Sequence, residues 1–239
     1  MKNYIPNTLT SLNLLSGCIA SVMAFHGKFL CVVAWVIVAA IFDFCDGFTA
    51  RLLKAYSPLG KELDSLADMV SFGVAPAIAV FTFLSMNMHV ISGNAFVVAY
   101  LPYVAFLLTV FSAMRLAKFN VDTRQTSSFM GLNTPANAMF WISLSYGLAN
   151  MPVVSAMLIY TVLFGIVLFS LLMVSEIPMF AFKIKNLKFA GNEYRYILVI
   201  GTIIMLIAAE VVLHSFILGI AGAVLFYIAL SLISNRKTA

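Results

Sequence analysis

Charge is scarce in this sequence. Only 10% of its 239 residues are charged, whereas 63% are hydrophobic and the mean hydropathy is +1.04. A soluble domain usually has about 25% charged and about 45–50% apolar residues. A soluble protein of this size could not bury so much apolar surface, so we expect the lipid bilayer to be its solvent. No hydrophilic stretch is long enough to fold separately, which predicts a single integral membrane domain over residues 1–239.

Cysteine and histidine are also scarce, with three residues of each. Cys18, Cys31 and Cys45 all lie in apolar stretches, where we expect small residues of the helix core and not disulfides or metal ligands. The histidines are scattered and show no zinc-type spacing. The net charge of +5 comes from basic residues spread between the apolar segments, so nucleic acid is not an expected partner.

Apolar segments of about 20 residues, the length that crosses a bilayer, recur along the whole chain. They predict an all-α, polytopic membrane helix bundle of about eight transmembrane helices. The fifth is short, with Pro135 in its first turn, and the last two form a helical hairpin. We read the first segment as a retained helix and not a signal peptide, because a second span follows at once. The expected spans are 8–25, 30–53, 65–86, 96–119, 135–150, 153–175, 196–213 and 215–234.

The basic residues also predict an orientation. When both termini and the alternate loops are counted as one side, that side holds nearly all of the 14 Lys and Arg residues, and the other side holds only Lys28. Because Lys and Arg favour the cytoplasmic side, both termini are expected in the cytoplasm. An even number of spans agrees with this arrangement of a multi-pass protein in the cell membrane.

Four aspartates stand out because ionisable groups within membrane segments are costly and usually face a cavity, a partner or an ion. Asp43 and Asp46 lie near the cytoplasmic end of the second predicted span, and Asp64 and Asp68 lie at the start of the third. Spacings of three and four residues place each pair on one helix face. A short turn returns the two helices antiparallel, so we expect all four carboxylates at a similar membrane depth.

Carboxylates at close quarters repel one another unless cations intervene. Without histidine or thiolate nearby, an oxygen-binding ion is implied: Mg²⁺, Mn²⁺ or Ca²⁺, and four carboxylates suit two such ions. Gly47, Ala50 and Gly60 leave room on the shared face for a flat or bulky group, and Arg51 beside it can pair with phosphate.

Two other uses of these aspartates are weaker. A buried ion-pair network that only joins helices would need more cations nearby. An ion-coupled transporter usually places such residues near the bilayer midplane, often within an inverted repeat, whereas here they lie near one surface and no repeat is visible.

The pattern Asp43-x-x-Asp46-Gly47-x-x-Ala50-Arg51, then eight residues, then Gly60-x-x-x-Asp64-x-x-x-Asp68 resembles the signature of the CDP-alcohol phosphotransferase family. The resemblance implies a six-helix core over residues 1–175, an added C-terminal hairpin at 196–234, a homodimer, and a cytoplasmic site with two divalent cations, Mg²⁺ or Mn²⁺. Asp43, Asp46 and Asp64 would hold metal, and Asp68 would be the general base with a share in the second metal. The nucleotide and diphosphate would be bound by Asp46, Gly47, Ala50, Arg51 and Gly60.

Other stretches resemble the membrane-type phosphatidylserine synthases of that family: Tyr4–Asn13, Ser71–Pro76, Arg115–Asn120 and Phe129–Pro135, although Asn133 stands where a proline is common. This implies transfer of the phosphatidyl group from CDP-diacylglycerol to L-serine, with release of CMP. A sister activity on glycerol phosphate, inositol phosphate or choline is the alternative. A phosphorylated acceptor should need a denser arginine cluster than this chain offers.

A serine pocket should contain a cation for the carboxylate and acceptors for the ammonium group. Arg115 and Lys118 are the candidate cations, although both could instead reach toward lipid headgroups. Asn7 could contact substrate or cap the first helix. The candidates for further polar contacts are Asn120, Ser127, Ser128 and Asn133.

Overall fold

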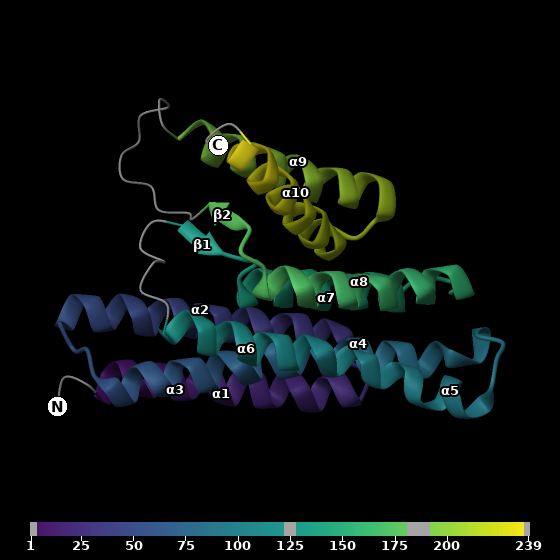
Figure 1. Cartoon of the computed structure of the whole chain (residues 1–239), viewed down its shortest axis with the longest axis horizontal. Helices are drawn as coiled ribbons and strands as arrows, with labels where there is room; N and C mark the ends of the chain where they lie inside the picture. The colour runs from purple at the N-terminus through teal and green to yellow at the C-terminus, as the bar shows by residue number, and fades with distance from the viewer. Residues whose placement is uncertain (1–3, 122–127, 181–191, 237–239) are drawn as a thin grey trace.

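The computed structural model describes residues 4–121, 128–180 and 192–236 of the chain (Figure 1). Seven helical stretches in these ranges are long and apolar enough to cross a membrane. The predicted fifth span, α7 (Thr134–Ala149), is apolar but has only 16 residues. The prediction of an all-α polytopic bundle is therefore confirmed, with α7 as its short member.

The elements pack in layers (Figure 1). Helices α1 to α6 lie together, α7 packs on α2 and α4, α8 packs on α6, and the hairpin of α9 and α10 packs through α10 on α7. The chain starts α1 and finishes α10 toward the same end of the bundle. The bounds are α1 Tyr4–Phe25, α2 Phe29–Leu53, α3 Pro58–Asp68, the π-helix η1 Met69–Val74, α4 Ala75–Asn87, the 3₁₀ helix η2 Met88–Val90, α5 Ala95–Tyr100, the 3₁₀ helix η3 Leu101–Phe106, α6 Leu107–Val121, β1 Ser128–Met130, α7, α8 Ala156–Val174, β2 Pro178–Phe180, α9 Glu193–Leu213 and α10 Phe216–Arg236.

Two helix starts differ most from the predicted spans. Helix α1 begins at Tyr4 and not at residue 8, because Pro6 is tolerated in a first turn, where no backbone N–H is needed. Helix α3 begins at Pro58 and not at residue 65, because Ser57 caps it by accepting a hydrogen bond from the Gly60 N–H at 3.0 Å. Asp64 and Asp68 therefore lie inside a helix that has already made its first turn.

The expectation that all three cysteines are core residues is wrong for two of them. Cys18 and Cys31 are exposed on the helix surface, Cys45 is half-buried, and all three are free thiols. The bilayer is as apolar as the protein interior, so a small apolar side chain gains little by facing inward. The core is instead formed by large residues such as Trp141, Phe72 and Phe83.

A short antiparallel pair of strands, which the sequence did not predict, joins the segment before α7 to the segment after α8. β1 pairs with β2, with Phe129 opposite Met179. Gly131 follows β1 with φ of 74°, a conformation that favours glycine, and its N–H donates to the Ile177 carbonyl at 2.8 Å. The pair lies toward the same end of the bundle as the α2–α3 turn (Figure 1).

Candidate active site

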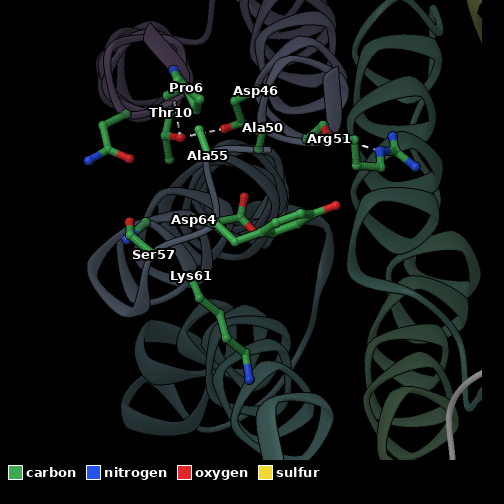
Figure 2. A pocket seen from close by; sticks show the side chains of 13 residues that line it. Pro6, Thr10, Asp46, Ala50, Arg51, Ala55, Ser57, Lys61 and Asp64 are labelled. Atoms are coloured by element: carbon green, nitrogen blue, oxygen red, sulfur yellow. Dashed lines mark hydrogen bonds between the residues drawn. The ribbon is translucent and has the colours of Figure 1, made fainter. Parts of the chain in front are cut away.

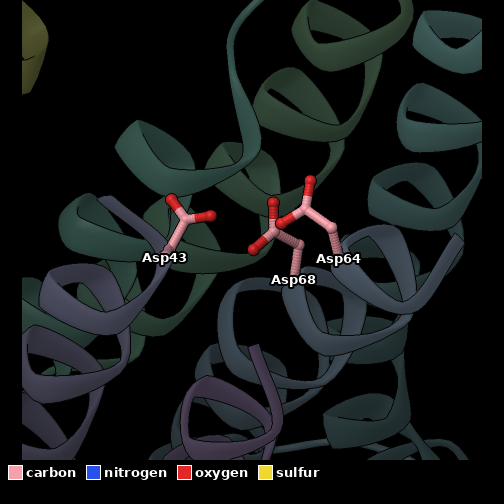
Figure 3. Close-up of side chains that lie close together, drawn as sticks. All are labelled: Asp43, Asp64 and Asp68. Carbon is pink, nitrogen blue, oxygen red and sulfur yellow. The ribbon is translucent and has the colours of Figure 1, made fainter. Parts of the chain in front are cut away.

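Three of the four predicted aspartates converge on one point. One carboxylate oxygen from each of Asp43, Asp64 and Asp68 can be chosen so that all three atoms lie within 4.8 Å of one another. Figure 3 shows Asp43 on α2 beside Asp64 and Asp68 on α3. The two helices meet this way because Lys54 ends α2 in a left-handed conformation, with φ of 50°, and the Ala55 N–H returns to the Ala50 carbonyl at 2.9 Å.

Asp46 lies outside this group of three, one helical turn beyond Asp43. Its side chain is buried, and Oδ2 accepts a hydrogen bond of 2.5 Å from the Thr10 hydroxyl. Asp46 and Asp64 both line the adjoining cavity. Asp46 and Asp64 thus face the cavity, and Asp64 also belongs to the cluster with Asp43 and Asp68.

The residues fit a divalent cation. Asp64 Oδ1 is buried and has no hydrogen-bond partner in the described part of the chain. Across the described ranges, no Lys or Arg forms an ion pair with Asp43, Asp64 or Asp68. Carboxylates held together without a counter-ion repel one another, and an all-oxygen ligand set suits a hard cation. The triad of Asp43, Asp64 and Asp68 could therefore bind a metal ion.

A cavity of about 330 Å³ adjoins the aspartates. Figure 2 shows it between the start of α1, the end of α2 and the turn into α3. Its volume lies at the small end of the range for small-molecule sites, about 300–1,000 Å³. Every residue predicted to bind the nucleotide lines it, and so does Asn7. The full lining is Pro6, Asn7, Thr10, Asp46, Gly47, Ala50, Arg51, Ala55, Tyr56, Ser57, Gly60, Lys61 and Asp64.

The small residues of the motif keep this cavity open. A Cβ atom at Gly47 would meet nothing within 4 Å, so the glycine leaves free space that a larger side chain would fill. At Gly60 a Cβ atom would lie 3.0 Å from Ser57 Oγ and 3.1 Å from Asn7 Oδ1, so the glycine allows α1 to approach the start of α3. Arg51 also lines the cavity, and its Nε donates to the Gly47 carbonyl at 2.9 Å.

Sequence reasoning missed several residues of this cavity. Thr10 is one of several hydroxyl-bearing residues in the first span, so its polarity alone could not single it out. Tyr56 and Lys61 belong to the α2–α3 turn and the first turns of α3, where no periodic pattern distinguishes a lining residue from a solvent-facing one. The remaining cavity residues without a predicted role are Pro6, Ala55 and Ser57.

Of the two candidate cations for the acceptor, Arg115 is the one with a donor nitrogen that makes no hydrogen bond in the described ranges. Its side chain is only 6% exposed, Nε donates to the Leu132 carbonyl, and Nη2 is buried without a hydrogen-bond partner in the described ranges. Lys118 Nζ instead lies 3.7 Å from Glu176 Oε1 and 3.4 Å from the Val174 carbonyl oxygen. A buried guanidinium with a spare donor is the better site for an incoming carboxylate.

Asn120 and Asn133 both have structural partners. The Asn120 side-chain amide donates to Ser65 Oγ at 2.8 Å, and the Asn120 backbone carbonyl accepts from Lys61 Nζ at 2.9 Å, which joins α6 to α3. Asn133 caps α7, accepting from the Ala136 N–H at 2.8 Å. It lines a second cavity of about 420 Å³ beside Tyr227 and not the cavity at the aspartates.

The other predicted polar contacts have different outcomes. Ser127 lies outside the described residues, and Ser128 is described only as backbone, in β1. The alternative role of Asn7 as a helix cap is wrong, because α1 begins three residues earlier and Asn7 lies within the helix, on the cavity wall.

The fold and this site together define a polytopic membrane protein with an acidic cluster that could bind a metal ion and an adjoining small-molecule cavity. The chain belongs to the CDP-alcohol phosphatidyltransferase family, whose model matches residues 3–181. Helices α9 and α10 lie beyond that match.

Three similar proteins within this family share one name. A CDP-diacylglycerol–serine O-phosphatidyltransferase of Bacillus subtilis is 31% identical over 144 residues, which cover 60% of this chain and 76% of the relative. The protein of that name from Methanocaldococcus jannaschii is 30% identical over 173 residues, 72% of each chain. The one from Helicobacter pylori strain J99 is 36% identical over 137 residues, and there the match spans only 54% of the relative.

Proposed function

We propose that this protein transfers the phosphatidyl group of CDP-diacylglycerol to the hydroxyl of L-serine and releases CMP. The observation that carries the proposal is the convergence of Asp43, Asp64 and Asp68 beside a cavity lined by every nucleotide-binding position of the family motif. The relatives named CDP-diacylglycerol–serine O-phosphatidyltransferase support serine as the acceptor.

Asp43, Asp46, Asp64 and Asp68 would hold two divalent cations, Mg²⁺ or Mn²⁺, with Ca²⁺ as a further candidate. Bound there, the ions would neutralise the diphosphate and stabilise the leaving CMP. Gly47, Ala50 and Gly60 leave room for the cytidine nucleotide, and the Arg51 guanidinium would turn toward the cavity to pair with the diphosphate.

Asp68 would act as the general base. The serine hydroxyl oxygen attacks the lipid-linked phosphorus, and the bond from that phosphorus to the oxygen of CMP breaks in line with the attack. The hydroxyl proton passes to the Asp68 carboxylate. The products are phosphatidylserine and CMP, and divalent cations held by the four aspartates would balance the negative charge on the leaving CMP.

Arg115 would bind the serine carboxylate. Its support is the buried Nη2, which has no hydrogen-bond partner in the described ranges. For Lys118, Asn120 and Asn133, the contacts with Glu176, Ser65 and the Ala136 N–H favour a role in holding the site together over direct contact with serine.

The surplus of Lys and Arg at the aspartate end favours a cytoplasmic site with both termini in the cytoplasm. CDP-diacylglycerol would then enter from the cytoplasmic leaflet, where its headgroup reaches the cavity and its acyl chains stay in the bilayer. A homodimer stays a prediction from the family resemblance.

The test offers purified protein CDP-diacylglycerol with one acceptor at a time: L-serine, glycerol 3-phosphate, inositol phosphate or choline. We expect CMP and phosphatidylserine in equal amounts with serine only. CMP release with glycerol 3-phosphate and not with serine would overturn the serine assignment. Flux of substrate across proteoliposomes without CMP formation would indicate a transporter instead.

A further inference from the structure

Helix α1 places two buried polar side chains, one turn apart, against the two aspartate-bearing helices. Thr10 is 3% exposed and donates to Asp46 on α2, and Asn13 is fully buried and donates to Asp68 on α3. A spacing of three residues places them on the same face of α1. Helix α1 therefore contacts both of the helices that carry the aspartates.

Asn13 holds the junction that carries Asp68 from two directions. Its side-chain amide donates to Asp68 Oδ1 at 3.2 Å, and its backbone carbonyl accepts from Ser71 Oγ at 2.9 Å. Asp68 ends α3, and Ser71 lies in the π-helix η1 that follows directly. A π-helical segment changes the helix register, so the direction of the Asp68 side chain depends on how this junction is fixed.

The approach of α1 to η1 is close. At Gly17, one turn after Asn13, a Cβ atom would lie 2.7 Å from Ser71 Cα and 2.9 Å from Ser71 N, so only glycine fits there. Backbones that approach this closely leave Asn13 little freedom to move. Its amide is therefore a fixed donor and not an adaptable one.

Asn13 is also costly to keep in this position. Its Oδ1 is buried without a hydrogen-bond partner in the described ranges, and such a group lowers the stability of the fold. A leucine of similar size would avoid that cost. The amide that donates to Asp68 is the feature that leucine lacks.

We propose that Asn13 is a positioning residue for Asp68: its amide fixes one carboxylate oxygen, so that the carboxylate keeps the rotation in which it accepts the acceptor's proton. The inference rests on the proposed function, in which Asp68 is the general base. Asn13 is not part of the cavity lining, so we expect it to act on Asp68 and not on the nucleotide.

The test replaces Asn13 by leucine, which keeps the volume and removes the donor. The matched control is Ser16→Ala on the same helix, because Ser16 is also buried and its hydroxyl donates only to the Leu12 carbonyl, at 2.7 Å. Asn13→Ala serves if the leucine variant does not fold. Four quantities are measured for each protein: kcat with serine, the KM for CDP-diacylglycerol, CMP affinity by calorimetry, and Mn²⁺ affinity by electron paramagnetic resonance.

For Asn13→Leu we expect kcat to fall by about 10- to 100-fold, as a misplaced catalytic group would, while CMP and Mn²⁺ affinities stay within about twofold of wild type. Ser16→Ala should keep all four values. Equal kcat in Asn13→Leu and Ser16→Ala would overturn the inference, and so would a joint loss of CMP and Mn²⁺ binding at unchanged folding. If wild-type protein itself forms no CMP with serine, the proposed function fails and the positioning role fails with it, whereas an active wild type with an equally active Asn13→Leu overturns the positioning role alone.

Discussion

At the scale of single residues, the four aspartates have four different surroundings. Asp46 accepts from a hydroxyl, Asp68 accepts from an amide, and Asp64 has a buried oxygen with no hydrogen-bond partner in the described ranges. Asp43 faces the last two across the gap between α2 and α3. A purely structural cluster would pair its charges with Lys or Arg, which the described residues do not do here.

The base role of Asp68 predicts a specific kinetic result for Asp68→Asn. The amide keeps the shape but accepts no proton, so kcat should fall by about 10²- to 10⁴-fold. The affinity for CMP should change much less. Steady-state kinetics and CMP calorimetry separate the two quantities. A large loss of CMP affinity with little loss of kcat would make Asp68 a ligand and not the base.

The open space at Gly47 predicts that the affinity for CMP falls as the side chain at this position becomes larger. A Cβ atom meets nothing within 4 Å, so Gly47→Ala should fold normally and bind CMP slightly less well than wild type. Gly47→Leu should fold equally well but fill part of the cavity and lower CMP affinity by at least about tenfold, which is 1.4 kcal/mol. Calorimetry with CMP and a melting curve measure both. CMP affinity of Gly47→Leu equal to wild type would show that the nucleotide binds elsewhere.

At the scale of elements, the sequence was sufficient for the spans and for the aspartate-bearing helix pair. Long apolar runs determine membrane helices, and spacings of three and four residues place carboxylates on one face. The sequence did not predict where helices begin, nor how the segment between β1 and α7 packs against the end of α8. Ser57 and Pro6 act through single caps and first turns, and β1 pairs with β2 across a long sequence separation that no local pattern records.

The acceptor side of the site was predictable only in part. Arg115 is recognisable as a cation inside an apolar helix. The partners of Lys118 and Asn120 come from other elements, so sequence could not show that Glu176 and Ser65 contact them. The cap formed by Asn133 could be read locally, since Pro135 marks the first turn of α7.

Gly131, which follows β1 and lies against the end of α8, should not tolerate a side chain. At φ of 74°, any other residue is strained by about 1–3 kcal/mol. The added Cβ would also lie 2.9 Å from the Leu172 carbonyl oxygen. We expect a lower melting temperature than wild type. Gly93→Ala is the control, because its Cβ would meet only Val98 Cγ2 at 3.7 Å. Equal melting temperatures for the two variants would contradict the role of Gly131.

At the scale of the whole molecule, α1, α2 and α3 carry the site, and α10 attaches the C-terminal hairpin to α7. The family model ends at residue 181, before that hairpin. The beginning of α1 and the end of α10 lie toward the same end of the bundle as the site. The side of the membrane on which the termini lie is therefore also the side on which the aspartates lie.

The distribution of Lys and Arg predicts that both termini lie in the cytoplasm. A green fluorescent protein fused at the C-terminus should fluoresce, because it folds in the cytoplasm, and alkaline phosphatase fused there should be inactive. Fusions made after Lys28, in the α1–α2 turn, should behave in the opposite way. Active phosphatase at the C-terminus would reverse the orientation and place the site on the outer face.

The most direct test of the metal centre counts the divalent ions bound by purified protein. After chelation and titration with Mn²⁺ in the presence of CMP, electron paramagnetic resonance should show about two ions bound per chain, as a four-carboxylate site implies. Asp43→Asn and Asp64→Asn should lose Mn²⁺ binding and activity together. Glu210→Gln, which removes an exposed acid on α9, should keep both. Mn²⁺ binding that is undetectable in wild type, or unchanged in Asp43→Asn and Asp64→Asn, would contradict the metal centre.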